Sequence, residues 1–173
     1  MKCFLLFSAI VFCAASAKCQ SVIDLDKQNG YLDLTFDLPV DSVIQKLNAK
    51  LIDSGDNHFT FYDIDSSTYK NFDDHYIAYT TLAKYDTDSF YGFNFVFILF
   101  FKEEYEKLIA LLTSLYGEPT RKNEILNTCD WIGTTTMIAL RYDDKAKLTS
   151  MNLINLRVVD KIELREKLKQ YLK

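Results

Sequence analysis

The sequence contains little glycine and proline, with 5 and 2 residues respectively in a chain of 173. This scarcity excludes a collagen-like or low-complexity chain and predicts regular elements joined by few loops. So few glycines also leave no room for a phosphate-cradling loop, and the Gly-x-Ser-x-Gly elbow of many hydrolases does not occur. The 2 histidines lack the His-Glu-x-x-His spacing of a zinc site.

The chain also lacks a surplus of positive charge, because its formal net charge is −4. Binding to a nucleic-acid backbone requires clustered Lys and Arg, and an anionic membrane surface attracts the same residues. We therefore expect neither a nucleic acid nor an anionic membrane surface as partner. Hydrophobic residues make up 49% and charged residues 25%, which is typical of a globular domain with a sizeable core.

The N-terminus has the three-part order of an export signal. Lys2 gives a positive start, Cys3 to Ala15 is uncharged and mostly apolar, and Ala15-Ser16-Ala17 supplies small residues at a cleavage site. The apolar stretch is too short for a spanning helix, which needs about 20 residues. We therefore predict a signal peptide over residues 1–19, cleaved after Ala17 or Cys19. The mature part, residues 20–173, is predicted to form a single α+β domain that is periplasmic or secreted.

Cysteine usage fits this interpretation. Cleavage removes Cys3 and Cys13, so the one disulfide that the mature chain could form is Cys19–Cys129. A lipid anchor on Cys19 is the alternative for that residue, but Lys18 stands where lipoprotein signals have a small residue. The absence of Asn-x-Ser/Thr sequons favours a bacterial over a eukaryotic exported protein.

Hydrophobic periodicity predicts the regular elements. Period-2 alternation or apolar runs predict strands, and apolar spacing of three and four predicts helices. The expected strands are 31–38, 59–64, 75–85, 92–101, 134–142 and 148–159, with 129–132 either extending the fifth strand or pairing separately. The expected helices are 40–51 with Gly55 beyond its end, 103–116 before Gly117, and a last helix opened by Asp160 and Glu163. Leu164, Leu168 and Tyr171 would face the core from that last helix.

The resulting order is β-α-β-β-β-α-β-β-α. Adjacent strands with short connections favour antiparallel pairing. The predicted fold class is α+β, with a largely antiparallel sheet and helices packed on one face.

Residues 93–156 carry a phenylalanine-rich strand, a helix that ends in Leu115-Tyr116-Gly117-Glu118-Pro119, then Trp131 and a strand with Asn152 and Asn155. This pattern resembles small uncharacterised exported bacterial α+β proteins. Their layout is similar to the β-lactamase-inhibitor-protein and outer-membrane-assembly-lipoprotein folds. The resemblance implies a non-enzymatic binding or envelope role, and it brings no catalytic residue with it.

An acidic segment is the most suggestive cluster for chemistry. Oxygen-bearing side chains recur with the spacing of a calcium loop at Asp63, Asp65, Ser67, Asn71 and Asp74. Thr68 replaces the required glycine and Asp74 the usual Glu, which excludes an EF-hand. A looser calcium site that includes Asp86 or Asp88 stays open, beside the alternative of a solvated acidic loop.

Two further hypotheses concern catalysis and recognition. His75 follows Asp73-Asp74, so a small secreted hydrolase or metal-dependent enzyme could use these three residues. Cys129 is a poor nucleophile candidate because the adjacent Asp130 disfavours a thiolate. Aromatic residues in or beside expected loops suit protein or carbohydrate recognition, unless they belong to the core: Tyr62, Tyr69, Phe72, Phe90 and Tyr91.

The sequence thus favours an exported non-catalytic protein that binds another protein or an envelope component. No cofactor and no catalytic residue are expected. The predicted binding residues combine the acidic and aromatic sets: Asp63, Asp65, Asp73, Asp74, His75, Tyr69, Phe72, Phe90 and Tyr91.

Overall fold

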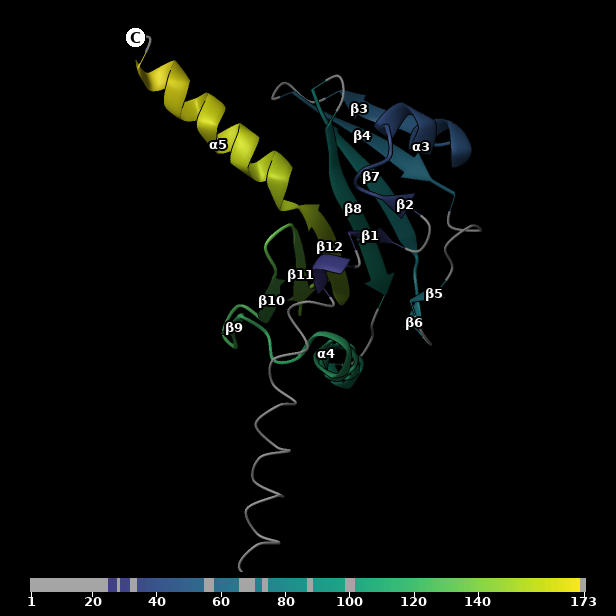
Figure 1. Cartoon of the computed structure of the whole chain (residues 1–173). Helices are drawn as coiled ribbons and strands as arrows, with labels where there is room; N and C mark the ends of the chain where they lie inside the picture. The colour runs from purple at the N-terminus through teal and green to yellow at the C-terminus, as the bar shows by residue number, and fades with distance from the viewer. Residues whose placement is uncertain are drawn as a thin grey trace, which may run out of the picture.

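The computed structural model describes residues 25–27, 29–31, 34–54, 58–65, 71–72, 75–86, 89–98 and 102–171. The fold is α+β, with helices and a large antiparallel sheet (Figure 1). Eight strands form this sheet in the order β3-β4-β7-β8-β12-β11-β10-β9, and every neighbouring pair is antiparallel. Their bounds are β3 Lys50–Ser54, β4 Phe59–Ile64, β7 Tyr79–Tyr85, β8 Ser89–Ile98, β9 Arg121–Asn123, β10 Thr128–Ile132, β11 Thr136–Asp143 and β12 Leu148–Asn155.

Two short hairpins lie outside this sheet. One pairs β1 (Gly30–Tyr31) with β2 (Leu34–Thr35), and the other pairs β5 (Asn71–Phe72) with β6 (His75–Tyr76). The longer helices of the described residues are α3 (Val40–Lys46), α4 (Lys102–Tyr116) and α5 (Leu156–Tyr171). Within the described part of the chain, none of them combines the length and the apolar character that a membrane crossing requires.

The large sheet consists of two halves with the same order of elements. The N-terminal half is α3 followed by β3, β4, β7 and β8, and the C-terminal half is α4 followed by β9 to β12. The last strand of each half, β8 and β12, pair at the centre of the sheet, with Asn94 opposite Asn152. The first strand of each half is therefore an edge of the sheet.

The two helices that open the halves end in the same way. Asn48 has φ 47° just after α3, and Gly117 has φ 79° just after α4. A residue in this left-handed conformation is the usual end of a helix. Superposing Asn48 on Gly117 places Leu47 on Tyr116 and Val43 on Leu112, all four of them buried.

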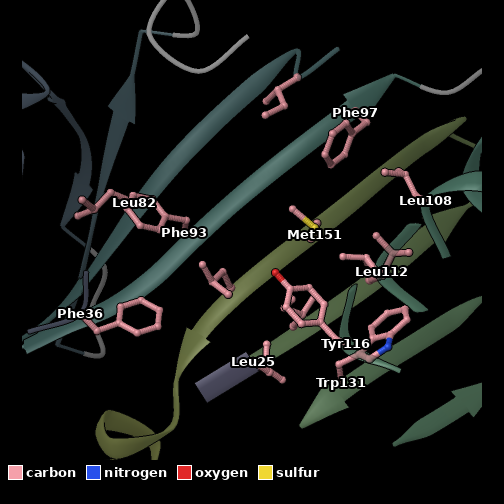
Figure 2. Close-up of a cluster of buried hydrophobic side chains, with 14 of the residues drawn as sticks. Leu25, Phe36, Leu82, Phe93, Phe97, Leu108, Leu112, Tyr116, Trp131 and Met151 are labelled. Carbon is pink, nitrogen blue, oxygen red and sulfur yellow. The ribbon is translucent and has the colours of Figure 1, made fainter. Parts of the chain in front are cut away.

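One core unites both halves. A register row of facing residues crosses six strands, and most of its members are almost inaccessible: Tyr62, Leu82, Phe93, Leu153, Ile138 and Trp131. Buried residues of α3 and α4, including Val43, Leu108 and Leu112, join the same cluster. Figure 2 shows Leu108 and Leu112 among the buried side chains. We call this side of the sheet the core face and the opposite side the outer face. The Trp131 indole also donates from Nε1 to the Gly117 carbonyl oxygen at 2.8 Å, which fixes the end of α4 to the sheet.

The segment before β1 is tied to the C-terminal half. Leu25 is buried in the core, and the Asp26 carboxylate accepts hydrogen bonds from the backbone and hydroxyl groups of Thr134 and Thr135 at 2.7–3.1 Å. Burial alone raises the pKa of Asp26, but these hydrogen bonds outweigh it and hold the pKa well below its usual range. A Cβ on Gly133 would lie 2.4 Å from Asp26 Oδ1, so glycine is needed for this close approach.

Several predicted elements differ from the structure. The expected helix 40–51 ends at Lys46, because Asn48 turns the backbone and residues 50–54 continue as β3. The expected strand 31–38 is instead the short β1–β2 hairpin, followed by a turn. The expected strand 75–85 is interrupted at Ile77 and Ala78. Residues 128–132 form their own strand, β10, and β3, β5 and β9 were not predicted.

The last helix was also predicted wrongly in its start and in the placement of Leu164, while the side chains of Leu168 and Tyr171 lie outside the described part of the chain. It begins at Leu156 rather than Asp160, because the Asn155 Oδ1 accepts a hydrogen bond from the Arg157 N–H at 3.2 Å and acts as the N-cap. The Leu164 side chain, expected to face the core, is 60% exposed. By contrast, β4 has the predicted bounds and α4 begins one residue early.

Candidate functional site

Two of the predicted binding residues come together at a polar hollow of about 450 Å³ in the N-terminal half. Asp63 lies on β4 and Asp65 just beyond it, facing the end of α3 and the start of β3 and β7. The hollow is lined by Lys46, Leu47, Asn48, Lys50, Asp63, Ile64, Asp65, Ala78 and Tyr79. Partial burial and the nearby Asp63 carboxylate raise the pKa of the Tyr79 hydroxyl. The hollow therefore offers charges of both signs beside an un-ionised phenol.

An aromatic cluster lies on the outer face at the start of β4. Phe59 is its centre, with its ring centroid 5.0 Å from that of Tyr91 and 5.1 Å from that of Tyr85. Phe61 stacks on Phe59 at 6.2 Å and is 38% exposed. Burial raises the pKa of the Tyr91 hydroxyl above its usual value. Such rings offer apolar area with polar tips at a surface.

The outer face continues this cluster across the sheet. Pairing register places Phe61, Ala83, Gly92, Ile154, Met137 and Ile132 opposite one another on six successive strands, and we call them the apolar row. Apart from Phe61, which is exposed, and Gly92, which is buried, its members are half-buried. The glycine is required there because an added Cβ would lie 2.2 Å from the Leu153 carbonyl oxygen.

The row beside the apolar row is mostly polar. Register places Asp63, Thr81, Asn152 and Asp130 along it. Asp130 accepts a 2.6 Å hydrogen bond from Arg141 Nη1 and is satisfied by this ion pair. The apolar row therefore has a polar row along one side, and protein-binding surfaces likewise combine apolar and polar groups.

The remaining predicted residues lie apart from this surface or outside the described part of the chain. Tyr69, Asp73 and Asp74 are outside it. Phe72 and His75 are register partners in the β5–β6 hairpin, which is separate from the eight-stranded sheet. Within the described residues, no three His, Cys, Asp or Glu side chains gather as metal ligands would.

Phe90 and Cys129 are core residues. Phe90 is 2% exposed and packs edge-on against Phe36 and Phe93, so the expectation of an exposed loop residue is wrong. Cys129 is a free thiol, 1% exposed, and the Tyr105 hydroxyl points at its Sγ from 3.8 Å. It is therefore unpaired in the structure, in contrast with the disulfide considered from the sequence, whose other member Cys19 lies outside the described residues.

The sequence interpretation missed Phe59, Phe61, Tyr79, Met137 and Ile154. Their signal is present, because β4, β11 and β12 carry apolar residues at both odd and even positions. Since register decides which residues share a face, the apolar row becomes visible only once the strands are aligned.

Comparison of the chain with protein-family models, with curated proteins and with solved structures gives no match.

Proposed function

We propose that this protein is an exported, non-catalytic binding module, and that it binds a protein partner through the outer face of its sheet. The observation that carries the proposal is the apolar row, which crosses six strands and ends in the aromatic cluster at Phe61. Export rests on the sequence features of residues 1–19, and a periplasmic or secreted location belongs to the same proposal.

The helices support this choice of face. The buried side chains of α3 and α4 belong to the core cluster, so we infer that these two helices pack on the core face and not on the outer face. Half-buried Ile154 and Met137 are too accessible for a core and unusually apolar for a surface patch. The resemblance to small exported bacterial proteins agrees with a binding role.

The proposed partner is a folded protein with an aliphatic or aromatic ridge on its surface. Such a ridge fits an apolar row with small residues, Ala83 and Gly92, between larger ones. A net charge of −4 favours a partner of positive charge, because opposite fields speed association. Tyr, Phe and Met are among the residues enriched in such interfaces.

The test is capture of partners from the organism's own envelope extract by the mature chain and by charge-inserting variants. Phe61→Lys and Met137→Lys place a cation at the end and within the apolar row, and each should abolish capture of the specific partner. Ile125→Lys is the matched control, because Ile125 is 92% exposed in the β9–β10 turn and remote in register from the row. This control should bind like the unaltered protein.

A captured protein supports the proposal only if substitutions in the apolar row reduce its capture. A partner bound equally well by Phe61→Lys, Met137→Lys and Ile125→Lys would contradict the proposal, as would failure to recover any specific partner. Far-UV circular dichroism of each variant verifies that lost capture does not reflect unfolding.

A further inference from the structure

The two edges of the eight-stranded sheet differ in a way that points to self-association. The edge strand β9 is short and polar, with Arg121, Lys122 and Asn123 all exposed. The other edge, β3, pairs with β4 and exposes apolar side chains, since Leu51 is 63% and Ile52 49% exposed. An exposed edge is a template for another strand, and natural proteins limit such pairing with charges and bulges. Strand β3 carries both, so we expect it to pair only with a strand whose charges match its own.

A bulge in β3 sets which of its side chains share a face. Lys50 lies opposite Asp63 and Asp53 lies opposite Phe61, with the register shift between Leu51 and Asp53. Asp63 and Phe61 both belong to the outer face, so Lys50 and Asp53 do too. In a regular strand, residues three apart would point to opposite faces. The bulge therefore brings this lysine and this aspartate to the same side.

This arrangement makes Lys50-Leu51-Ile52-Asp53 complementary to a second copy of itself. When two such strands run antiparallel about a two-fold axis between Leu51 and Ile52, Lys50 of each copy faces Asp53 of the other. Leu51 then faces Ile52 across the same axis. Directly opposed residues must lie on one face of a sheet, and the bulge satisfies this condition for both charged pairs.

We propose that the protein forms a symmetric dimer through antiparallel pairing of β3 with β3 of a second copy. The strand that pairs with β3 is β3 of a second copy of this chain. In the antiparallel arrangement the two segments place opposite charges across from each other and apolar residues across from apolar residues. Lys50 then lies between two carboxylates, Asp63 of its own chain and Asp53 of the other. The sheet becomes continuous across the dimer. This inference uses the edge of the sheet and does not depend on the proposed binding function of the outer face.

The experiment measures the mass of the mature protein by sedimentation equilibrium over a range of concentrations. The unaltered protein should show a concentration-dependent dimer. Asp53→Lys places lysines opposite lysines in both pairs, and Lys50→Glu places carboxylates opposite carboxylates. Each should weaken self-association about 30-fold, on the basis of typical energies of opposed charge pairs.

Mixing the two variants gives the decisive measurement. In the mixed dimer, Lys50 faces Asp53 and the introduced lysine faces the introduced glutamate, so all pairs are attractive again. An equimolar mixture should therefore dimerise at lower concentration than either variant alone. Lys122→Glu on the opposite edge β9 is the matched control and should dimerise like the unaltered protein.

Three results would overturn the proposal. The first is a monomer at all concentrations of the unaltered protein, and the second is undiminished dimerisation of Asp53→Lys. The third is failure of the mixture to associate when both variants are folded by circular dichroism. If Lys50→Glu is unfolded by its proximity to Asp63, Asp53→Lys alone decides, because its neighbour on β4 is the uncharged Phe61. Pairing of β3 with a strand of a different protein would appear as a monomer in this assay and is counted against the dimer.

Discussion

The N-terminal and C-terminal halves share an order of elements but place their apolar residues differently. The C-terminal half has the longer helix, a tight β10–β11 connection at 133–135 and a polar edge strand. The N-terminal half has the shorter helix, an insertion with the β5–β6 hairpin at 65–78, an exposed apolar edge and the aromatic cluster. The comparison teaches that both halves contribute to one buried core but differ at their edges, because the edge strand of the N-terminal half exposes apolar side chains and that of the C-terminal half exposes polar ones.

The largest expected loss of stability comes from core residues and tests how much each half contributes to the shared core. Leu112 of α4 and Val43 of α3 occupy matching positions, and both are buried. Leu112→Ala should cost about 3–4 kcal/mol of unfolding free energy. Val43→Ala should cost only about 2 kcal/mol, because fewer methylene groups are lost. Urea unfolding followed by circular dichroism measures both, and a larger cost at Val43 would reverse the comparison.

Loss of the hydrogen bonds between Asp26 and the β10–β11 connection should give the next largest loss of stability. Asp26→Ala leaves the N–H groups of Thr134 and Thr135 without their carboxylate and should cost about 2–3 kcal/mol. The pKa of Asp26 is lowered in the fold, so its stabilisation is complete well above the unfolded pKa of about 4. It declines as the pH falls below that value.

The measurement is thermal unfolding between pH 7 and pH 2.5. The difference in melting temperature between the unaltered protein and Asp26→Asn should shrink toward low pH, since the unaltered carboxyl then binds a proton on unfolding. A difference that stays constant with pH would show that the charge of Asp26 contributes nothing.

These contacts also show how much of the fold the sequence predicts. Helix α4 and strand β4 follow from periodicity and from Gly117, because their signals are local. The end of α3 has no such local signal. The left-handed residue that ends α3 is Asn48 rather than a glycine, and Leu51 fits the helical spacing although it belongs to β3. The start of α5 was missed because Asn155 was interpreted as a strand residue, although Asn is among the best N-caps.

The candidate site is less predictable than the fold for a physical reason. Asp63 and Asp65 were singled out by charge, and they do line the polar hollow. The apolar row, in contrast, joins Phe61 to Ile132 through four other strands, and nothing local in the chain encodes that register. Phe90 shows the reverse error, because an aromatic residue near a loop was placed in the core by the bulge of β8 against β7.

The helix ends allow a smaller and sharper test of the comparison between halves. Gly117 at φ 79° has no Cβ, so Gly117→Ala should cost about 1–2 kcal/mol through backbone strain. Asn48 already carries a side chain at φ 47°, so Asn48→Gly should relieve strain and be neutral or slightly stabilising. Urea unfolding of both variants checks this, and equal destabilisation by the two changes would show that the ends are not equivalent.

The smallest expected effect concerns the exposed link between the two halves. Arg157 at the start of α5 donates from Nη1 to Asp37 Oδ1 at 2.7 Å, and both side chains are more than half exposed. Water and salt screen such a pair, so Arg157→Ala should change the unfolding free energy by less than about 0.5 kcal/mol. Arg141→Ala should lower the unfolding free energy by more, because it leaves the largely buried Asp130 carboxylate without its ion-pair partner. If unfolding in urea showed the reverse order, the exposed link would be holding the halves together, and their stability could no longer be attributed to the shared core.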